Sequence, residues 1–347
     1  MTHPLSEDLD HILNHTKNLW EEVRNQNIFM TGGTGFFGIW LLESFLWANH
    51  HLDLNAKITI LTRDPGKFLN RFPHLKENKS LSFLQGDVRN FNFPEGHYSH
   101  IIHAATEASE KLNNETPLLM LDTIIEGTRR TLDFAVKCHA KKFLLTSSGA
   151  VYGKQPVDMT HIPESYQGAP DLSDPLSAYA QGKRMAEFLC SVYASMHLIE
   201  CKIARGFAFV GPYLPLDTHF AIGNFIRDAL GGGPIHIKGD GTPYRSYLYA
   251  ADMAIWLWTI LFKGENCQPY NVGSDDGKPL IEIAKITALT IEPPVPITVA
   301  KEIVPCSPIH HYIPSTVRAR NHLGLKEIID LPEAIRLTTV WNRAISN

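Results

Sequence analysis

Residues 28–38 read IFMTGGTGFFG, and this stretch decides the fold that we predict for the whole chain. The apolar run at its start is typical of a buried strand, and the glycines that follow have the spacing TGxxGxxG. Because glycine has no Cβ, the backbone N–H groups of such a turn can approach a pyrophosphate at the positive end of the next helix. An apolar helix from about 37 to 49 supplies that context. We therefore predict a dinucleotide site lined by Gly32, Gly35, Phe36, Phe37 and Gly38.

Short apolar segments alternate with helical segments along the chain after this turn. Strands are expected at 57–62, 81–84, 101–102, 142–146 and 203–209, and helices at 117–139 and 177–196. Strands that are apolar at every position, and not only at alternate ones, indicate a parallel sheet with both faces covered by helices. The predicted fold class is α/β: a Rossmann-type doubly wound parallel sheet with a smaller, mixed α/β C-terminal lobe for the substrate.

The same rhythm divides the chain into three parts. Residues 5–26 have the apolar spacing of an amphipathic helix, so residues 1–27 are expected to form a helical extension that packs on the main domain. Residues 28–204 are expected to form the dinucleotide-binding domain. Residues 205–347 are expected to form mainly the substrate-binding lobe, with the segment at about 245–272 returning to the first domain.

Composition excludes several classes of function. The 347 residues carry a net charge of −4, so no basic excess is available to bind a nucleic acid backbone. No window approaches the roughly 20 apolar residues of a membrane span, and the first residues lack the basic and apolar regions of a secretory signal. Five scattered cysteines favour a reducing cytoplasm. The 17 histidines show no metal-ligand spacing, so no metal is predicted.

The end of the second predicted strand bears on the choice of cofactor. Many NAD-binding folds carry an acid there for the ribose 2′-hydroxyl, whereas this chain has Thr62 followed by Arg63. An arginine can bind a 2′-phosphate through charge-assisted hydrogen bonds, which favours NADP. NAD stays possible, because the carboxylate of Asp64 could reach a ribose hydroxyl. Further cofactor contacts, near the adenine and where the sheet must admit the cofactor, are expected at Asp87, Val88, Ala104 and Ala105.

Tyr179 and Lys183 form a second chemical signal, because residues four apart on a helix lie on one face. A nearby ammonium and a cationic nicotinamide lower the pKa of a tyrosine from its usual value of about 10. The phenol can then exchange a proton with a sugar or alcohol oxygen, while Lys183 also holds the nicotinamide ribose. Ser148, at the end of the fifth predicted strand, supplies a hydroxyl to the same oxygen. Should Tyr179 not be the acid, Glu107 and Glu164 are the alternatives.

Together these motifs resemble the extended short-chain dehydrogenases/reductases of the NAD-dependent epimerase/dehydratase group, which act on nucleotide sugars. The resemblance runs from about residue 28 to the C-terminus. It is carried by motifs at 31–38, 86–88, 103–105, 147–153, 179–183, 205–212, 239–241, 245–252 and 270–273. It implies a nucleotide-sugar substrate, and a homodimer in which the helices at 117–139 and 177–196 pair across a two-fold axis.

Two departures from the family pattern narrow the reaction. In the family's 4,6-dehydratases an Asp and a Glu follow the Ser148 position, and its decarboxylases keep the Glu, whereas this chain has Gly149 and Ala150. Neither residue can act as an acid or base, so dehydration and decarboxylation are disfavoured. The remaining chemistry is reduction of a 4-keto-6-deoxy sugar nucleotide or, alternatively, 4-epimerisation. A non-catalytic dinucleotide sensor is disfavoured because Ser148, Tyr179 and Lys183 are all kept.

The resemblance also implies substrate contacts. Arg245 sits where the family places an arginine on the nucleotide diphosphate, and a guanidinium suits two phosphates better than an ammonium does. Arg318 could be a second phosphate clamp, and His219 and Asn224 could line the sugar site. For these three residues, a surface or loop-anchoring role is an equal alternative.

Overall fold

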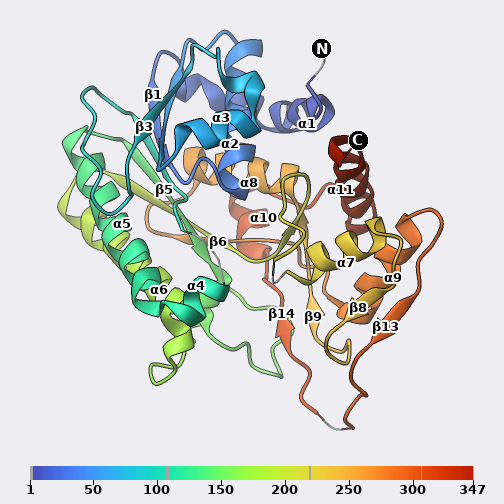
Figure 1. The fold of residues 1–347 in the computed structure, drawn as a ribbon. Coiled ribbons are helices and arrows are strands. Elements are labelled where there is room, and N and C mark those ends of the chain that lie inside the picture. The colour runs from blue at the N-terminus through green and yellow to red at the C-terminus, as the bar shows by residue number, and fades with distance from the viewer. Residues whose placement is uncertain (1–2, 107–109, 219, 306, 347) are drawn as a thin grey trace.

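A seven-stranded parallel sheet forms the larger part of the computed structural model, which describes residues 3–106, 110–218, 220–305 and 307–346 (Figure 1). The strands lie in the order β11-β6-β5-β4-β1-β2-β3. From β1 the chain moves outward through β2 and β3, then crosses to the other side of β1 and continues through β4, β5, β6 and β11. This reversal between β1 and β4 is the doubly wound arrangement, in which ligands bind at the carboxyl ends of the two strands. The predicted fold class is confirmed.

The central strands of this sheet are buried along most of their length, which is why their sequences are apolar. In β1, Thr31 lies beside Leu61 of β2 and His103 of β4, so the carboxyl ends of the three strands are aligned. The strands are β1 (Asn27–Thr31), β2 (Lys57–Thr62), β3 (Leu81–Gln85), β4 (His100–His103), β5 (Lys142–Ser148), β6 (Glu200–Gly206) and β11 (Pro269–Val272).

Helices cover both faces of the sheet (Figure 1). One face carries the core around Trp40 and Trp258, and the other carries the core around Phe134 and Phe143. In the described part of the chain, no helix combines the length and the apolar character needed to cross a membrane. The first face is covered by α2 (Phe36–His51), α3 (Pro65–Arg71) and α8 (Ala250–Lys263), and the second by α5 (Pro117–Lys137), which follows α4 (Glu110–Glu115), and α6 (Ala178–Met196).

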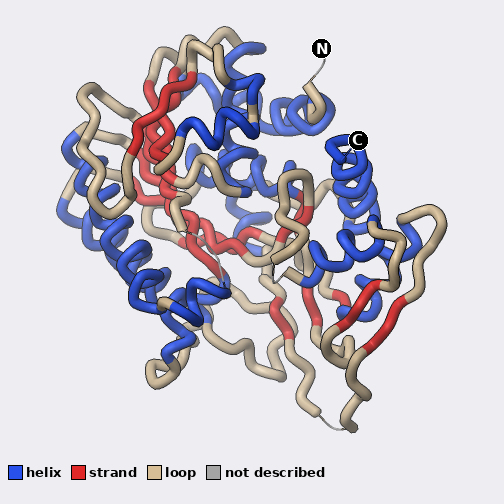
Figure 2. Tube along the Cα trace, viewed as in Figure 1, coloured by secondary structure: helices blue, strands red, loops and turns tan. Residues whose placement is uncertain are grey.

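A smaller lobe is built from the C-terminal part of the chain, and its short strands stand apart from the main sheet (Figure 2). Strand β13 pairs in parallel with β8, and β14 and β12 flank β9. The strands are β8 (Ile235–Ile237), β9 (Tyr244–Arg245), β12 (Lys278–Pro279), β13 (Ile297–Val299) and β14 (His311–Tyr312). The helices are α7 (Ala221–Leu230), α9 (Leu280–Thr290), α10 (Val317–Leu323) and α11 (Leu331–Ser346).

Two predicted elements are wrong in extent. The sequence predicts one helix over 5–26, but α1 (Ser6–Thr16) is followed by a 3-10 helix over Lys17–Val23. The hydroxyl of Thr16 donates to a backbone carbonyl one turn earlier and accepts from the indole N–H of Trp20, so a side-chain bond spans the change of helix type. The strand predicted over 203–209 is β6 plus a separate β7 (Phe209–Val210), which pairs with β10 (Leu248–Tyr249).

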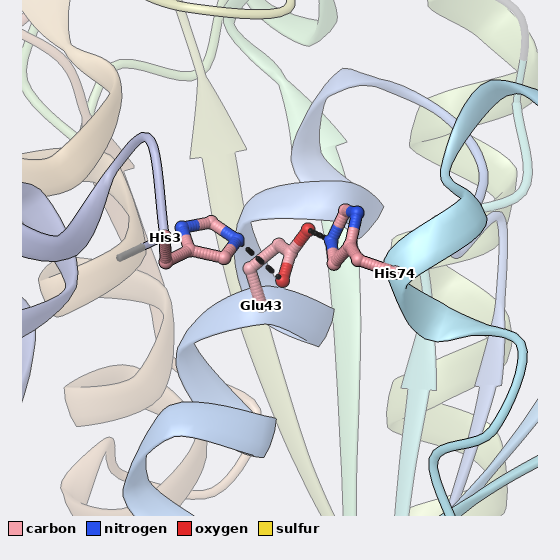
Figure 3. Close-up of side chains that lie close together, drawn as sticks. All are labelled: His3, Glu43 and His74. Atoms are coloured by element: carbon pink, nitrogen blue, oxygen red, sulfur yellow. Dashed lines mark hydrogen bonds and ion pairs between the residues drawn. The ribbon is translucent and has the colours of Figure 1, made fainter. Parts of the chain in front are cut away.

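The N-terminal segment is joined to α2 and to the connection after α3 by one buried carboxylate, that of Glu43 (Figure 3). The Oε1 atom of Glu43 lies 2.8 Å from Nε2 of His74, and Oε2 lies 3.4 Å from Nε2 of His3. Burial raises the pKa of Glu43, but its interactions with His3 and with His74 outweigh that effect, so the net shift of the pKa is downward. The hydrogen bond to Glu43 raises the pKa of His74.

The three ligand atoms of this cluster lie within 4.8 Å of one another, a spacing that is compatible with a metal ion. The contacts of His3 argue against that use. The backbone N–H of Leu5 donates to Nδ1 of His3 over 3.1 Å, which leaves the ring proton of the neutral imidazole on Nε2, the atom that faces Glu43. Because a protonated nitrogen has no lone pair for a metal, we interpret the cluster as an ionic clamp between three segments of the chain.

We expect the His74–Glu43 pair to stabilise the fold most between the two ordinary pKa values, 4.5 for Glu43 and 6.5 for His74. Because the pKa of Glu43 is lowered, its contribution is present above pH 4.5 and is lost as the pH falls through the lowered value. Because the pKa of His74 is raised, its contribution is complete below pH 6.5 and is lost as the pH rises through the raised value.

His74→Gln should therefore reduce the free energy of unfolding near about pH 5.5, by no more than about 1 kcal/mol because the pair is partly exposed. Near about pH 9 the reduction should be smaller, because His74 has then lost its proton. Urea denaturation at the two pH values measures the difference. His51→Gln is the control, since it removes an exposed histidine whose Nδ1 faces the carbonyl of Trp47. An effect of His74→Gln that is the same at both pH values would contradict this interpretation.

Candidate active site

The glycine turn after β1 packs directly on the end of β4. Gly32 has a φ of +72°, and a Cβ there would lie 2.3 Å from the carbonyl carbon of Ala104. A Cβ on Gly38 would lie 2.2 Å from the carbonyl oxygen of Gly32, so neither position has room for a side chain. Helix α2 begins at Phe36 with Gly35 as its N-cap, and no side chain within the described residues caps this end. The turn therefore presents the start of a helix at the switch point, as dinucleotide binding requires.

A buried row of hydrogen-bonded polar side chains lies next to this turn. The Nδ1 atom of His103 lies 2.8 Å from the hydroxyl of Thr31, and Nε2 lies 3.0 Å from the hydroxyl of Thr128. Burial, with the charge of Lys183 acting in the same direction, lowers the pKa of His103 to about 3, so the ring is neutral at neutral pH. The hydroxyl of Thr31 also accepts from the backbone N–H of Ala105 over 3.3 Å, which fixes the backbone beside the glycine turn.

The residues predicted to select the cofactor lie at the carboxyl ends of β2 and β3. Arg63 is exposed. Asp64 is the N-cap of α3 and accepts from the backbone N–H of Lys67 over 2.8 Å, so its carboxylate has a structural partner. Asp87 forms two bonds of 2.9 and 3.0 Å with the guanidinium of Arg89. The bond to Arg89 holds the pKa of Asp87 below its ordinary value, and the charge of Arg63 adds to the effect.

The apolar residues predicted for the cofactor site pack on neighbouring helices and strands at the carboxyl ends of the sheet. The ring of Phe37 lies edge-on to that of Phe209 at 5.0 Å, and the ring of Phe36 lies 6.0 Å from that of Phe37. Val88 packs on α5, where its Cγ1 atom would lie 2.9 Å from a Cβ on Gly127. These contacts place Phe37 against β7, with Phe36 beside it, and Val88 between β3 and α5.

Ser148, Tyr179 and Lys183 come together at the carboxyl end of β5. Ser148 is the last residue of that strand, and its hydroxyl accepts from the backbone N–H of Ala150 over 3.2 Å. The ammonium of Lys183 lies 5.9 Å from the centre of the Tyr179 ring. Burial raises the pKa of Tyr179 in the protein without a cofactor, and the nearby hydroxyl of Ser148 opposes that shift. The lowered pKa expected from the lysine together with a cationic nicotinamide stays a prediction.

Two oxygen atoms near the carboxyl ends of β4 and β5 hold the side chain of Lys183. Its ammonium donates to the backbone carbonyl of Thr146 over 2.7 Å and to the hydroxyl of Thr106 over 3.0 Å. Burial lowers the pKa of Lys183 to about 8, and the carboxylate of Glu187, one helical turn further along α6, opposes that shift. The side chain is thus fixed, and it stays largely protonated at neutral pH.

Glu187 anchors α6 to the two neighbouring strands. It accepts from the hydroxyl of Ser147 over 2.5 Å and from the guanidinium of Arg205 over 2.9 and 2.6 Å. The sequence analysis did not single out this network, although the spacing of four between Lys183 and Glu187 places both on one face of the helix. Glu187 therefore positions the helix face that carries Tyr179 and Lys183.

Tyr312 of β14 lies beside this site, although no motif in the sequence indicated it. Its hydroxyl oxygen lies 2.8 Å from where a Cβ on Gly149 would stand, and its ring centre lies 4.8 Å from that of Phe207. Arg245, predicted to bind the diphosphate, is paired with Tyr312 in the register of β9 and β14, and its guanidinium carbon lies 5.9 Å from the Tyr312 ring centre. The smaller lobe therefore brings Arg245 and a third hydroxyl to the carboxyl end of β5.

The other predicted substrate residues have anchoring contacts. Asn224 of α7 accepts from the guanidinium of Arg227 over 3.0 Å. Arg318 of α10 donates to the backbone carbonyl of Pro269 in β11 over 2.9 Å. These contacts match the anchoring alternative stated for both residues, and a role in substrate binding stays a prediction.

Three further residues were predicted as a sugar contact or as alternative acids. His219 and Glu107 lie outside the described residues. Glu164 accepts from the backbone N–H of Asn271 in β11 over 2.9 Å, so its carboxylate already has a structural partner.

The turn, the crevice and the serine, tyrosine and lysine beside it define a dinucleotide-binding α/β protein with groups suited to proton and hydride transfer. The sequence profile of the NAD dependent epimerase/dehydratase family matches residues 28–273, and the chain belongs to this family. UDP-glucuronic acid decarboxylase 6 of Arabidopsis thaliana is 30% identical over 320 residues, which cover 90% of this chain and 88% of the plant protein. UDP-glucuronic acid decarboxylase 1 of Xenopus tropicalis is 26% identical over 76% of this chain and 60% of the relative.

Solved structures of the same fold include enzymes of different reactions. UDP-N-acetylglucosamine 4-epimerase from Methanobrevibacter ruminantium has a TM-score of 0.77 at 22% identity, over 92% of this chain and 99% of the other. A dTDP-glucose 4,6-dehydratase from Streptomyces venezuelae, solved with NAD, has a TM-score of 0.76 at 21% identity, over 92% of this chain and 97% of the other. These likenesses support the fold, and they leave the reaction to be argued from the site.

We expect Lys183→Met to weaken cofactor binding by about 10-fold or more, because a hydrogen bond from a charged group contributes roughly 1.5–3 kcal/mol. Fluorescence titration with NADPH measures the dissociation constant. Lys202→Met is the matched control, since Lys202 is also buried but donates to the carbonyl of Gly264 near the amino end of β6. Equal losses of affinity in the two variants would show that removing a buried lysine, and not its place in the site, is responsible.

Proposed function

We propose that the protein is an NAD(P)-dependent oxidoreductase that reduces the 4-keto group of a nucleotide sugar, with a 4-keto-6-deoxy sugar as the favoured substrate. A bound nicotinamide cofactor would supply the hydride for C4, and Tyr179 is the residue that donates a proton to the oxygen on that carbon, which becomes a hydroxyl. Ser148 hydrogen-bonds the same oxygen as charge develops on it. Lys183 holds the nicotinamide ribose and supplies a positive charge beside the tyrosine.

The observation that carries this proposal is what lies beside Ser148. Dehydration and decarboxylation in the family use carboxylates at the next two positions, and this chain has Gly149 and Ala150. A Cβ on Gly149 would lie 2.7 Å from Cζ of Phe207 and 2.8 Å from the hydroxyl oxygen of Tyr312. An aromatic ring and a phenol thus fill the space of the first carboxylate, and Ala150 offers none at the position of the glutamate that the decarboxylases keep. We therefore do not propose the reaction for which the plant relatives, at 30% identity, are named.

A 4-epimerase is the second candidate, and the structural neighbours named as 4-epimerases favour it. Oxidation at C4 followed by hydride return to the opposite face needs the same serine, tyrosine and lysine. The two candidates differ in cofactor use, because a reductase consumes one reduced cofactor per turnover and an epimerase regenerates its own. A non-catalytic sensor is disfavoured because Ser148, Tyr179 and Lys183 are all kept, with the ammonium of Lys183 5.9 Å from the centre of the Tyr179 ring.

NADP is the cofactor that we propose, with NAD as the alternative. Arg63 is exposed at the carboxyl end of β2, where a 2′-phosphate would lie. Asp64, the residue that favoured NAD, is engaged as the N-cap of α3. Structural neighbours solved with NAD support the alternative.

We also propose a homodimer formed through α5 and α6, in a reducing compartment such as the cytoplasm. The outer faces of these helices expose large apolar side chains, with Leu118 at 73%, Phe188 at 61% and Met196 at 70%. Such apolar side chains, gathered on two adjacent helices, favour a second copy with the same surface. Cysteines 138, 190, 201 and 267 are free thiols, which fits reducing conditions.

The reaction is tested by incubating the protein with 4-keto-6-deoxy sugar nucleotides and NADPH. We expect loss of NADPH absorbance and, by NMR of the product, a hydroxyl at C4. Tyr179→Phe should keep the fold and cofactor binding but lower turnover by roughly 10²–10⁴-fold, the usual contribution of a general acid. Product without net cofactor consumption would favour the epimerase. Dehydration of a 6-hydroxylated sugar nucleotide, or release of CO₂ from UDP-glucuronate, would overturn the proposal.

Arg63→Ala tests the choice of cofactor. We expect the affinity for NADPH to fall by about 10- to 150-fold, because a charged hydrogen bond of roughly 1.5–3 kcal/mol is lost, while the affinity for NADH is unchanged. Arg71→Ala is the control, since Arg71 lies at the other end of α3 with its guanidinium carbon 5.2 Å from the centre of the Phe72 ring. Equal losses for the two cofactors in Arg63→Ala would contradict NADP selection.

A further inference from the structure

We propose that Asn113 is a positioning residue for the reaction proposed above, and that it acts by capping the helix that carries Tyr179. The inference rests on the proposed function and adds to it a residue outside the reacting groups. Asn113 lies on α4, 66 positions before Tyr179 in the chain. Its Oδ1 atom accepts from the backbone N–H of Tyr179 over 3.0 Å, and its Nδ2 atom donates to the backbone carbonyl of Leu176 over 2.7 Å.

The start of α6 needs a cap from elsewhere in the fold. The first N–H groups of a helix have no partner inside it, and a serine just before the helix usually accepts from one of them. Ser177 holds that position, but its hydroxyl donates to the backbone carbonyl of Asp171 over 2.8 Å and does not cap the helix. Because Tyr179 is the second residue of α6, the amide oxygen of Asn113 takes the place of the missing cap.

Both groups of the Asn113 amide have a backbone partner of the matching kind. A backbone N–H only donates and a carbonyl only accepts, so the two partners fix which way the amide points. The side chain thereby joins Leu176 to Tyr179 across the change from the 3-10 helix Pro175–Ser177 to α6. Because one bond reaches the backbone of Tyr179 itself, it sets where the first turn of the helix places the phenol.

The same connection between β4 and α5 also holds the lysine of the site. The hydroxyl of Thr106, which follows β4, accepts from the ammonium of Lys183 over 3.0 Å. One turn further along α6, Glu187 ties the helix to β5 and β6. The helix is therefore held at three successive turns, and of these contacts the one from Asn113 is made to Tyr179.

Loss of this cap should act on proton transfer and leave cofactor binding unchanged. A general acid must lie within hydrogen-bond reach of the oxygen that it protonates, and a displacement of about 1 Å can lower turnover by about 100-fold. Lys183, which is proposed to hold the nicotinamide ribose, keeps its own bonds to Thr106 and Thr146. A residue with a structural role alone would lower stability without separating these two steps.

Asn113→Leu tests the role, because leucine has a similar shape and neither donates nor accepts. We expect kcat for the ketone to fall by about 10- to 100-fold, with the dissociation constant of NADPH unchanged. Asn49→Leu is the matched control. The Asn49 amide accepts from the backbone N–H of Ala56 over 2.9 Å and donates to its carbonyl over 3.1 Å, near the amino end of β2. Both variants should lose thermal stability, but only Asn113→Leu should lose kcat.

A second variant separates the two hydrogen bonds of Asn113. Asn113→Asp keeps an acceptor for the N–H of Tyr179 and loses the donor to Leu176. A carboxylate also suits the start of a helix, where it meets unpaired N–H groups. We therefore expect Asn113→Asp to keep a kcat close to that of the wild type, because the bond to Tyr179 is the one that positions the phenol.

A third measurement does not need the substrate. NMR of tyrosine labelled with ¹³C at the ζ carbon follows the ionisation of Tyr179, assigned with Tyr179→Phe. Burial raises the pKa of Tyr179 above its ordinary value of 10. Loosening the first turn of α6 brings water to the phenol, so the pKa should fall toward 10 in Asn113→Leu and stay unchanged in Asn49→Leu. If the wild type reduces no ketone, the proposed function fails, while this titration still decides whether Asn113 positions Tyr179.

Each outcome bears on the proposal. A lower kcat in Asn113→Leu at unchanged NADPH affinity, its recovery in Asn113→Asp and the lower pKa of Tyr179 support it. Equal losses of kcat in Asn113→Leu and Asn49→Leu would mean that lost stability is responsible, and would overturn it. Wild-type kcat in Asn113→Leu, a kcat as low in Asn113→Asp, an equally large loss of NADPH affinity, or an unchanged Tyr179 titration would overturn it as well.

Discussion

The contact between the glycine turn and the end of β4 is the constraint on which the rest of the site depends. The backbone of Gly32 rests on that of Ala104 with no space for a Cβ, and Gly38 rests on Gly32 in the same way. The neutral ring of His103 hydrogen-bonds with the hydroxyls of Thr31 and Thr128. A side chain at 32 or 38 would push α2 away from the sheet. The start of the helix therefore faces the carboxyl ends of the strands, because the backbone packed against the glycine turn leaves it no other position.

The residues proposed to react lie around the carboxyl end of β5, where Ser148 is the last residue of the strand. Tyr179 lies on α6, which Glu187 ties to the sheet through Ser147 and Arg205. Tyr312 comes from the smaller lobe, and its hydroxyl oxygen lies 2.8 Å from where a Cβ on Gly149 would stand. The next residue, Ile313, accepts from the backbone N–H of Ile162. The proposed site is therefore built from both the main domain and the smaller lobe.

The parts of this arrangement that the sequence predicts are those with a local signature. A buried parallel strand is apolar at every position, a glycine turn has a fixed spacing, and Tyr179 and Lys183 are four apart on one helix, so each of these signals is contained in a few residues. The strand predicted over 203–209 is wrong because two distant partners divide it. Strand β6 pairs with β11 up to Gly206, and β7 pairs with β10 from Phe209.

The remaining features depend on residues that only the fold brings together. Tyr312 and Gly149, or His3, Glu43 and His74, are far apart in the sequence, and no spacing rule links them. The pKa of Tyr179 in the protein without a cofactor depends on the fold for a related reason. The spacing of the lysine is visible in the sequence, whereas the burial that raises the pKa comes from several elements at once. Local patterns therefore identify the chemical groups, and tertiary packing sets their properties.

Membership of a family and the reaction performed are fixed by different residues. The constraints on Gly32, Gly38 and His103 act on the backbone of the proposed cofactor site and not on the groups proposed to react. The proposed reaction depends on the two positions after Ser148 and on what the lobe places opposite them. A carboxylate cannot be placed at Gly149 by one substitution, because its Cβ would lie 2.7 Å from the ring of Phe207 and 2.8 Å from the hydroxyl of Tyr312. Both aromatic residues would have to move, so packing keeps the first of the two carboxylates used by the family's dehydratases out of this site. At Ala150, the position of the glutamate that the decarboxylases keep, the methyl side chain supplies no acid or base.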